Sequence, residues 1–171
     1  VTLPEGITLA EAIEILHRES TLTKTPLDEL SIALLAMTGR EDSAEGLFLP
    51  ETWSYTRADS DLDILQRSHL ALNELLTSLW EQRSEGLVLS SPYAALTLAS
   101  IVEKETGVAD ERKQIAGVFL RRLEKGMRLQ TDPTVIYGLG DDYDGDIKRR
   151  HLRDTTNPYN TYAIHGLPPT P

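Results

Sequence analysis

The pattern of hydrophobic positions along the chain is mainly helical. Apolar residues recur three and four positions apart in five long segments, which is the spacing of one face of an α-helix. We therefore expect helices that begin near residues 8, 26, 60, 91 and 110, and a shorter one over residues 132–137. Capping residues agree with these bounds, because Thr8 and Ser91 precede helical patterns and Gly39, Gly107 and Gly126 follow them.

Three short segments are predicted to be extended or hairpin-like instead. Residues 1–3 and 127–130 have the composition of short strands, and Asp144-Gly145 is a dipeptide typical of hairpin turns. The predicted fold class is therefore α+β, a helix-rich core domain with short strands that follows a small helical segment. We expect residues 1–90 to form the N-terminal helical part, with an aromatic loop, and residues 91–171 to form the core domain.

The composition excludes several classes of protein. The net charge is -10 and the pI is about 4.8, whereas a nucleic-acid-binding protein normally presents a basic face. Because cysteine is absent, disulfides, thiol catalysis and cysteine-ligated metals are excluded. No apolar run approaches the roughly 20 residues that cross a bilayer. No signal peptide precedes Val1, and both chain ends are abrupt, so we expect a fragment that is either soluble or anchored by a segment outside it.

One carboxylate stands on the apolar side of a predicted helix. Leu98, Ile101, Val102 and Glu105 follow one another at helical spacing, whereas Glu103 points away from that face. Burial of a carboxyl group raises its pKa, and a protonated carboxyl is the general acid that glycosidic cleavage requires. We therefore predict that Glu105 is buried and catalytic. Two structural roles compete with this interpretation: a position at the edge of the apolar face, or a buried ion pair with an arginine.

The sequence predicts no cofactor and no metal. The histidines at positions 17, 69, 151 and 165 lack metal-binding spacing. The acidic run at residues 141–146 lacks the spacing and the terminal glutamate of an EF-hand, so we interpret it as a solvated turn. A phosphate-binding loop of the G-x-x-x-x-G-K type is absent as well.

Several segments resemble one known family along essentially the whole chain. The segment Ala99-Ser-Ile-Val-Glu-Lys-Glu-Thr106 resembles the active-site segment of the YceG-like family of endolytic murein transglycosylases, also called MltG. Residues 1–6, 45–52 and 159–169 agree in the same order, and the block from Gly126 to Gly138 is the most specific match.

The resemblance implies a reaction and a location. The catalytic glutamate of the family corresponds to Glu105, the second glutamate of Glu-Lys-Glu. Members cut the MurNAc–GlcNAc β-1,4 bond inside peptidoglycan strands without water, leave 1,6-anhydro-MurNAc ends, and terminate nascent strands. They are inner-membrane proteins whose catalytic domain faces the periplasm. An N-terminal membrane helix, most of a LysM-like region (its edge at residues 1–20) and a C-terminal continuation of the domain are expected to lie outside this chain.

Six further residues are predicted to bind substrate or to support Glu105. Gln130, Thr131 and Asp132 follow a predicted strand, although Asp132-Pro133 also fits a helix cap. Asn160 and Tyr162 belong to the family-like segment Tyr-Asn-Thr-Tyr, in which Asn160 equally fits a turn. Glu45 lies in the aromatic loop and is the candidate for a second carboxylate, with packing or capping as its alternative.

Three other functions compete with a lytic transglycosylase. A peptidoglycan hydrolase would hold a water, with Glu45 as the base. A non-catalytic wall-binding module within the cell-wall synthesis machinery would leave Glu105 structural. An aminodeoxychorismate lyase, a label given to this family, would need a desolvated lysine, and Lys104 points to solvent.

Overall fold

The chain divides into two compact helical units. A computed structural model describes all 171 residues, in which unit 1 comprises Val1–Gln82 and unit 2 comprises Arg83–Pro171. Each unit has its own cluster of buried aliphatic side chains. The assignment of functions to an N-terminal and a core part stays a prediction.

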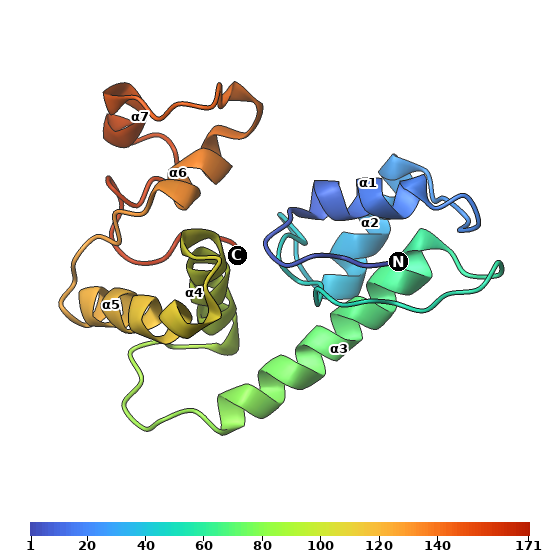
Figure 1. Cartoon of the computed structure of the whole chain (residues 1–171), viewed down its shortest axis with the longest axis horizontal. Helices are drawn as coiled ribbons and strands as arrows, with labels where there is room; N and C mark the ends of the chain where they lie inside the picture. Colours follow the sequence, from blue (N-terminus) through green and yellow to red (C-terminus); the bar gives the residue numbers. More distant parts are fainter. The chain divides into compact units, whose positions relative to one another are not determined.

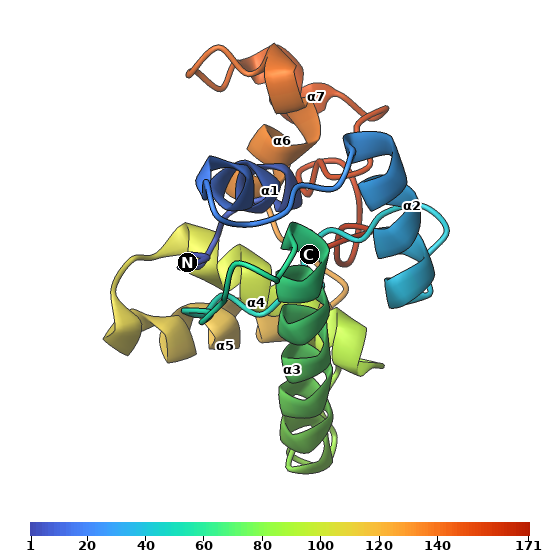
Figure 2. The same cartoon turned by 90° about the vertical axis from the view of Figure 1, so that its right-hand side faces the viewer.

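Unit 1 is built from three helices whose ends are set by side-chain caps. These are α1 (Leu9–Arg18), α2 (Leu27–Thr38) and the long α3 (Asp61–Glu81), coloured blue to green in Figures 1 and 2. Thr8 and Ser60 each form a capping box with the acidic residue three positions later, and Gly39 ends α2 with a φ of 65°. The predicted starts of these three helices and the predicted stop at Gly39 are thus confirmed.

A buried carboxylate ties the start of α3 to the rest of unit 1. Asp61 is fully buried and accepts hydrogen bonds from His17 Nε2 at 2.8 Å and from the Thr25 hydroxyl at 2.6 Å. Burial disfavours the ionised form, but the hydrogen bonds from Thr25, His17 and the Leu62 amide outweigh it and hold the pKa of Asp61 below its ordinary value. This carboxylate therefore holds α1, the loop before α2 and α3 together.

Unit 2 contains four α-helices and two single-turn 3₁₀ helices. Pro92–Glu105 forms α4, the 3₁₀ turn η1 (Ala109–Glu111) leads into α5 (Arg112–Glu124), and α6 (Asp132–Leu139) is followed by η2 (Gly140–Asp142) and α7 (Arg149–Arg153). Ser91 caps α4 as predicted, since its hydroxyl accepts from the Ala94 amide. α4 and α5 pack side by side (Figures 1 and 2), and their cluster comprises Leu98, Ile101, Val102, Phe119 and Leu129.

The predicted α+β fold class is wrong, because the protein is all-helical. Extended pairing is limited to two isolated bridges, Thr2 with Thr52 and Thr23 with Ser60, and no sheet forms. In place of the predicted strand at residues 1–3, only the single antiparallel bridge of Thr2 with Thr52 forms. No helix combines the length and the apolar content that a membrane crossing requires.

Side chains and single backbone contacts replace the predicted strand at residues 127–130. The Leu129 carbonyl accepts a hydrogen bond from the Arg122 guanidinium, and the Gln130 amide donates to the Thr161 carbonyl at 3.1 Å. Because these groups already have partners, the segment needs no neighbouring strand. The predicted hairpin at Asp144-Gly145 is likewise a turn without strands, where Asp144 forms an ion pair with Lys148.

We predict that the Asp61→Asn substitution destabilises unit 1 by about 1–3 kcal/mol at pH 7, because a buried charge-assisted network loses an acceptor. Since the pKa of Asp61 is lowered by folding, its stabilisation is present above the ordinary value of 3.8 and is lost as the pH falls through the lower folded value. Urea unfolding followed by tryptophan fluorescence measures this, because both tryptophans, Trp53 and Trp80, lie in unit 1.

Asp63→Asn is the matched control for Asp61. Asp63 occupies the same first turn of α3 but is exposed and serves only the Ser60 cap, so its loss should cost less than about 1 kcal/mol. Equal destabilisation by the two substitutions would contradict the role given to Asp61.

Candidate active site

Glu105 is the last residue of α4, and its side chain is exposed. The prediction that it is buried on the apolar face is therefore wrong. Leu98, Ile101 and Val102 do form that face, but the hydrophobic cluster ends with Val102, so the next residue on the same line lies beyond it. The alternative of an edge position describes this geometry, whereas no ion pair joins Glu105 to an arginine.

A buried hydroxyl fixes the exposed carboxylate. Thr131, the N-cap residue of α6, is only 3% exposed, and its hydroxyl donates a hydrogen bond of 2.7 Å to Oε2 of Glu105. The other carboxylate oxygen, Oε1, has no hydrogen-bond partner in the structure. One oxygen of Glu105 is thus held by the protein while the other is available to a bound molecule.

The neighbouring glutamate is engaged differently. Glu103 forms an ion pair with Arg112 of α5, with 3.2 Å between Oε2 and Nη2. Lys104 is exposed, as the helical wheel predicts. The three consecutive charged residues therefore take separate directions, and Glu105 alone meets Thr131.

Gln130 has the single non-glycine positive φ of the structure, 53°. This left-handed conformation costs a residue with a Cβ roughly 1 kcal/mol or more. It turns the chain between the buried Leu129 and the buried Thr131, so that the Thr131 hydroxyl reaches Glu105. Gln130 itself is exposed beside this contact, where its amide side chain is available to a ligand.

Asp132 and Tyr162 form the polar border of the site. Asp132 was an alternative candidate for a helix cap, but Thr131 holds the N-cap position and Asp132 begins α6. Its carboxylate Oδ1 accepts a 2.7 Å hydrogen bond from the Tyr162 hydroxyl. Burial raises the pKa of Tyr162 to about 12, the hydrogen bond and charge of Asp132 and the charge of Glu105 add to the effect, and Arg122 opposes it. Tyr162 therefore stays a neutral hydrogen-bond donor to Asp132.

The side chain of Asn160 forms hydrogen bonds with backbone groups of the site. It is fully buried, its side-chain amide donates to the carbonyls of His151, Leu152 and Asp154, and its Oδ1 accepts from the Tyr162 amide at 3.0 Å. With its polar atoms used in this way, Asn160 joins the end of α7 to Tyr162. This geometry favours the turn interpretation of Asn160 over direct contact with substrate.

Glu45 belongs to unit 1, where it supports a helix start. Its carboxylate accepts a 2.7 Å hydrogen bond from the Leu9 amide, the first residue of α1, where an anion is favoured by the helix dipole. The geometry agrees with the capping alternative. A role of Glu45 beside Glu105 stays a prediction.

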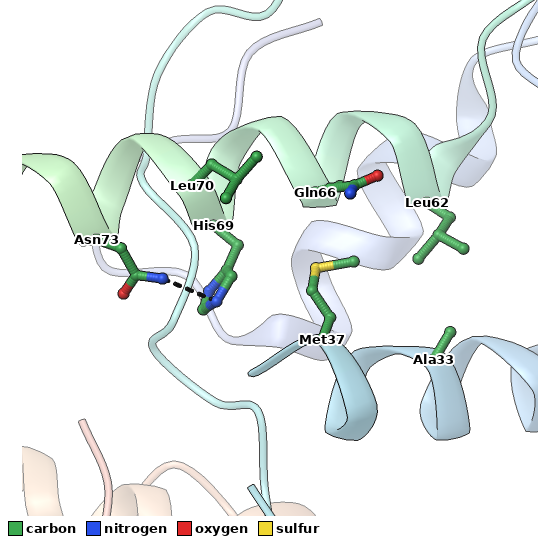
Figure 3. A pocket seen from close by; sticks show the side chains of 7 residues that line it. All are labelled: Ala33, Met37, Leu62, Gln66, His69, Leu70 and Asn73. Atoms are coloured by element: carbon green, nitrogen blue, oxygen red, sulfur yellow. Dashed lines mark hydrogen bonds between the residues drawn. The ribbon is translucent and has the colours of Figure 1, made fainter. Parts of the chain in front are cut away.

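A cavity of about 530 Å³ lies elsewhere, between α2 and α3 of unit 1 (Figure 3). The His69 ring is turned toward Asn73 and is bonded on both nitrogens, by the Leu47 carbonyl and the Asn73 amide. No carboxylate lines this cavity, so it lacks an acid for glycosidic cleavage. No group of three or more histidine, aspartate or glutamate side chains in the structure is placed to hold a metal ion.

Comparison with known proteins agrees with the resemblance. The model of the YceG-like family matches residues 1–171. The chain belongs to the YceG-like family. A Bacillus subtilis protein named endolytic murein transglycosylase is 36% identical over 128 residues, which cover 74% of this chain and 34% of that protein. A Streptococcus pneumoniae protein of the same name is 30% identical and is matched over 100% of this chain and 35% of its own length.

A solved structure is also similar to this YceG-like chain. A crystal structure of a YceG-like protein from Listeria monocytogenes matches with a TM-score of 0.70 and 28% identity, covering 99% of this chain and 61% of that one. The chain spans about a third of the length of the curated relatives it matches.

Two residues of the site were not predicted from the sequence. Thr134 and Thr161 are buried, and their hydroxyls bond to the backbone of Thr131. Thr161 lies within the quoted segment Tyr-Asn-Thr-Tyr, so the family-like segment was the available signal. Its separation of 30 residues from Thr131 hides the contact from any local pattern.

We predict that Tyr162 titrates near pH 12, well above the ordinary value of 10.0. Because folding raises this pKa, the associated stabilisation is complete below pH 10 and is lost as the pH rises through 12. Carbon-13 NMR of the tyrosine ring carbon bonded to oxygen follows the ionisation, and Tyr162→Phe assigns the signal.

Asp132→Asn should lower the pKa of Tyr162 only in part. The negative charge is removed, but burial, the largest cause of the shift, is kept. A wild-type Tyr162 signal that titrates at the ordinary value would contradict this description of the site.

Proposed function

We propose that this chain carries the catalytic glutamate of an endolytic murein transglycosylase, and that Glu105 is that residue. One observation carries the proposal: an exposed carboxylate, fixed on one oxygen by a buried hydroxyl, lies in the Glu-Lys-Glu segment of a YceG-like chain. The relatives' shared name, endolytic murein transglycosylase, supports the substrate and the reaction class.

The first step is general acid catalysis. Glu105, protonated on Oε1, gives its proton to the oxygen that bridges C1 of MurNAc and C4 of GlcNAc. The bond from C1 to that oxygen breaks, the GlcNAc side leaves as an alcohol, and C1 gains oxocarbenium character. The Thr131 hydroxyl hydrogen-bonds Oε2 and so stabilises the carboxylate that forms.

The second step closes the sugar on itself. The C6 hydroxyl of the same MurNAc attacks C1, and the anionic Glu105 takes the hydroxyl proton, which returns the enzyme to its starting state. Attack within one sugar gains from proximity, so the reaction requires neither water nor a second carboxylate as nucleophile. This agrees with Glu45, which is occupied at the start of α1.

The polar border gives the sugar its hydrogen-bond partners. Gln130 is exposed beside Thr131, and the neutral Tyr162 hydroxyl and the Asp132 carboxylate form a donor and acceptor pair. N-acetyl and hydroxyl groups of the glycan require such partners. We assign Gln130, Asp132 and Tyr162 to substrate binding. Thr131 is assigned the role of orienting Glu105.

The wider role follows the family resemblance. We propose that the whole protein acts at the inner membrane with this part in the periplasm, is anchored by a helix outside this chain, and terminates nascent glycan strands beside the cell-wall synthesis machinery.

We expect Glu105→Gln to lower the rate of strand cleavage by roughly 10²- to 10⁴-fold or more, because the general acid and base is lost. Purified peptidoglycan is digested with the protein, and the released fragments are quantified by mass spectrometry. Fragments longer than a disaccharide with anhydro ends are the expected wild-type product.

Glu103→Gln is the matched control. It removes a carboxylate two residues away whose partner is Arg112, so cleavage should stay within about threefold of wild type, as for a surface ion pair. Full activity of a folded Glu105→Gln variant, or an equal loss in the Glu103→Gln variant, would overturn the assignment of Glu105.

A further inference from the structure

Three buried threonines surround the contact between Thr131 and Glu105. Thr131, Thr134 and Thr161 are 3%, 5% and 0% exposed. The Thr161 hydroxyl accepts from the Thr131 amide at 3.1 Å, and the Thr134 hydroxyl donates to the Thr131 carbonyl at 2.9 Å. Buried side chains therefore form hydrogen bonds with the peptide groups on both sides of Thr131.

The hydroxyl protons of Thr134 and Thr161 are shared within this group, because each hydroxyl has one proton. Both hydroxyls are placed to donate to the Thr131 carbonyl, Thr134 at 2.9 Å and Thr161 at 3.3 Å. The hydroxyl that does not donate to this carbonyl can donate in the 2.9 Å contact between Thr134 and Thr161. The Thr131 hydroxyl takes no part in these bonds, so its proton is available for Oε2 of Glu105.

The same side chains hold the chain in a costly conformation. Gln130, directly before Thr131, has a φ of 53°, and its amide donates to the Thr161 carbonyl at 3.1 Å. A left-handed non-glycine residue persists only where surrounding contacts determine it. Residue 161 supplies two such contacts, one from its carbonyl and one from its hydroxyl.

We infer that Thr134 and Thr161 are positioning residues of the proposed reaction: they clamp the Thr131 backbone so that its hydroxyl orients Glu105 toward the glycosidic oxygen. The inference rests on the proposed function of Glu105. Neither residue forms a hydrogen bond with Glu105, so both act through Thr131.

The clamp has a chemical consequence. Glu105 ends a helix and is exposed, so packing does not restrict its side chain, and Thr131 is its hydrogen-bond partner. Proton transfer requires the donor oxygen to lie within hydrogen-bond distance of the leaving oxygen, and a displacement of about 1 Å costs on the order of a hundredfold in rate. Loss of the clamp should therefore lower kcat and leave KM nearly unchanged.

The test compares variants of equal shape. Thr161→Val and Thr134→Val remove a hydroxyl and keep the volume, and Thr161→Ser keeps the hydroxyl. Thr97→Val is the matched control, since Thr97 is also buried in unit 2 and its hydroxyl donates to a backbone carbonyl, that of Tyr93, within α4. Steady-state cleavage of purified glycan strands gives kcat and KM, and thermal unfolding followed by circular dichroism gives stability.

We expect Thr161→Val to lower kcat about ten- to a hundredfold with KM within twofold, Thr134→Val to lower it in the same way, and Thr161→Ser to restore most of the rate. Thr97→Val should keep the wild-type kcat while losing similar stability. An unchanged kcat in both folded Thr134 and Thr161 valine variants, or equal losses in the Thr97 control, would overturn the inference.

A second readout separates this inference from the proposed function. In Thr161→Val the Thr131 amide loses its acceptor, so its hydrogen exchange should accelerate about tenfold, whereas the Gln130 amide keeps the Thr161 carbonyl. This NMR measurement needs no substrate. Accelerated exchange in a protein that cleaves no glycan would contradict the proposed function alone, whereas unchanged exchange at Thr131 would contradict the clamp.

Discussion

The hydrogen bond from the Thr131 hydroxyl to Glu105 is the contact on which the candidate site depends. It joins the end of α4 to the start of α6, two elements that are 26 residues apart. The hydrophobic cluster that contains Leu98, Val102, Phe119 and Leu129 packs these parts of unit 2 together. The buried hydroxyls of Thr134 and Thr161 hold the backbone of Thr131. The proposed general acid is therefore an exposed carboxylate whose orientation is set by a buried hydroxyl.

The two units differ in net charge, and this difference agrees with the proposal that the reaction takes place on unit 2. Unit 1 contains 15 acidic and 5 basic side chains, whereas unit 2 contains 12 of each, so the whole net charge of -10 belongs to unit 1. Peptidoglycan carries carboxylates of its own, and like charges disfavour association. Under the proposed function, the neutral unit, which contains Glu105, would repel a glycan strand less than unit 1 would. Unit 1 depends instead on an internal carboxylate, Asp61, whose partners draw α1 and α3 together.

The local parts of this structure were predictable, and the long-range parts were not. Caps at Thr8 and Ser91 and the helix stop at Gly39 follow from side-chain chemistry within four residues, and they are confirmed. The helical wheel selected Glu105 over Glu103 but wrongly predicted its burial, because a wheel does not show where the packed neighbours end. The strand at residues 127–130 was wrong because Arg122, seven residues from Leu129, and Thr161, much farther along the chain, satisfy that backbone. Thr161 was not predicted as a site residue because it lies 30 residues from Thr131.

The source of the oxygen in the product tests the central claim, an intramolecular attack promoted by one carboxylate, most directly. Glycan strands are cleaved in water enriched in the heavy isotope of oxygen, and the new ends are analysed by mass spectrometry. We predict anhydro ends that contain no heavy oxygen, because the C6 hydroxyl of the sugar is the nucleophile and Glu105 only moves protons. Reducing ends that carry the heavy isotope would contradict the account, since they would show that water attacks C1 and that the protein is a hydrolase.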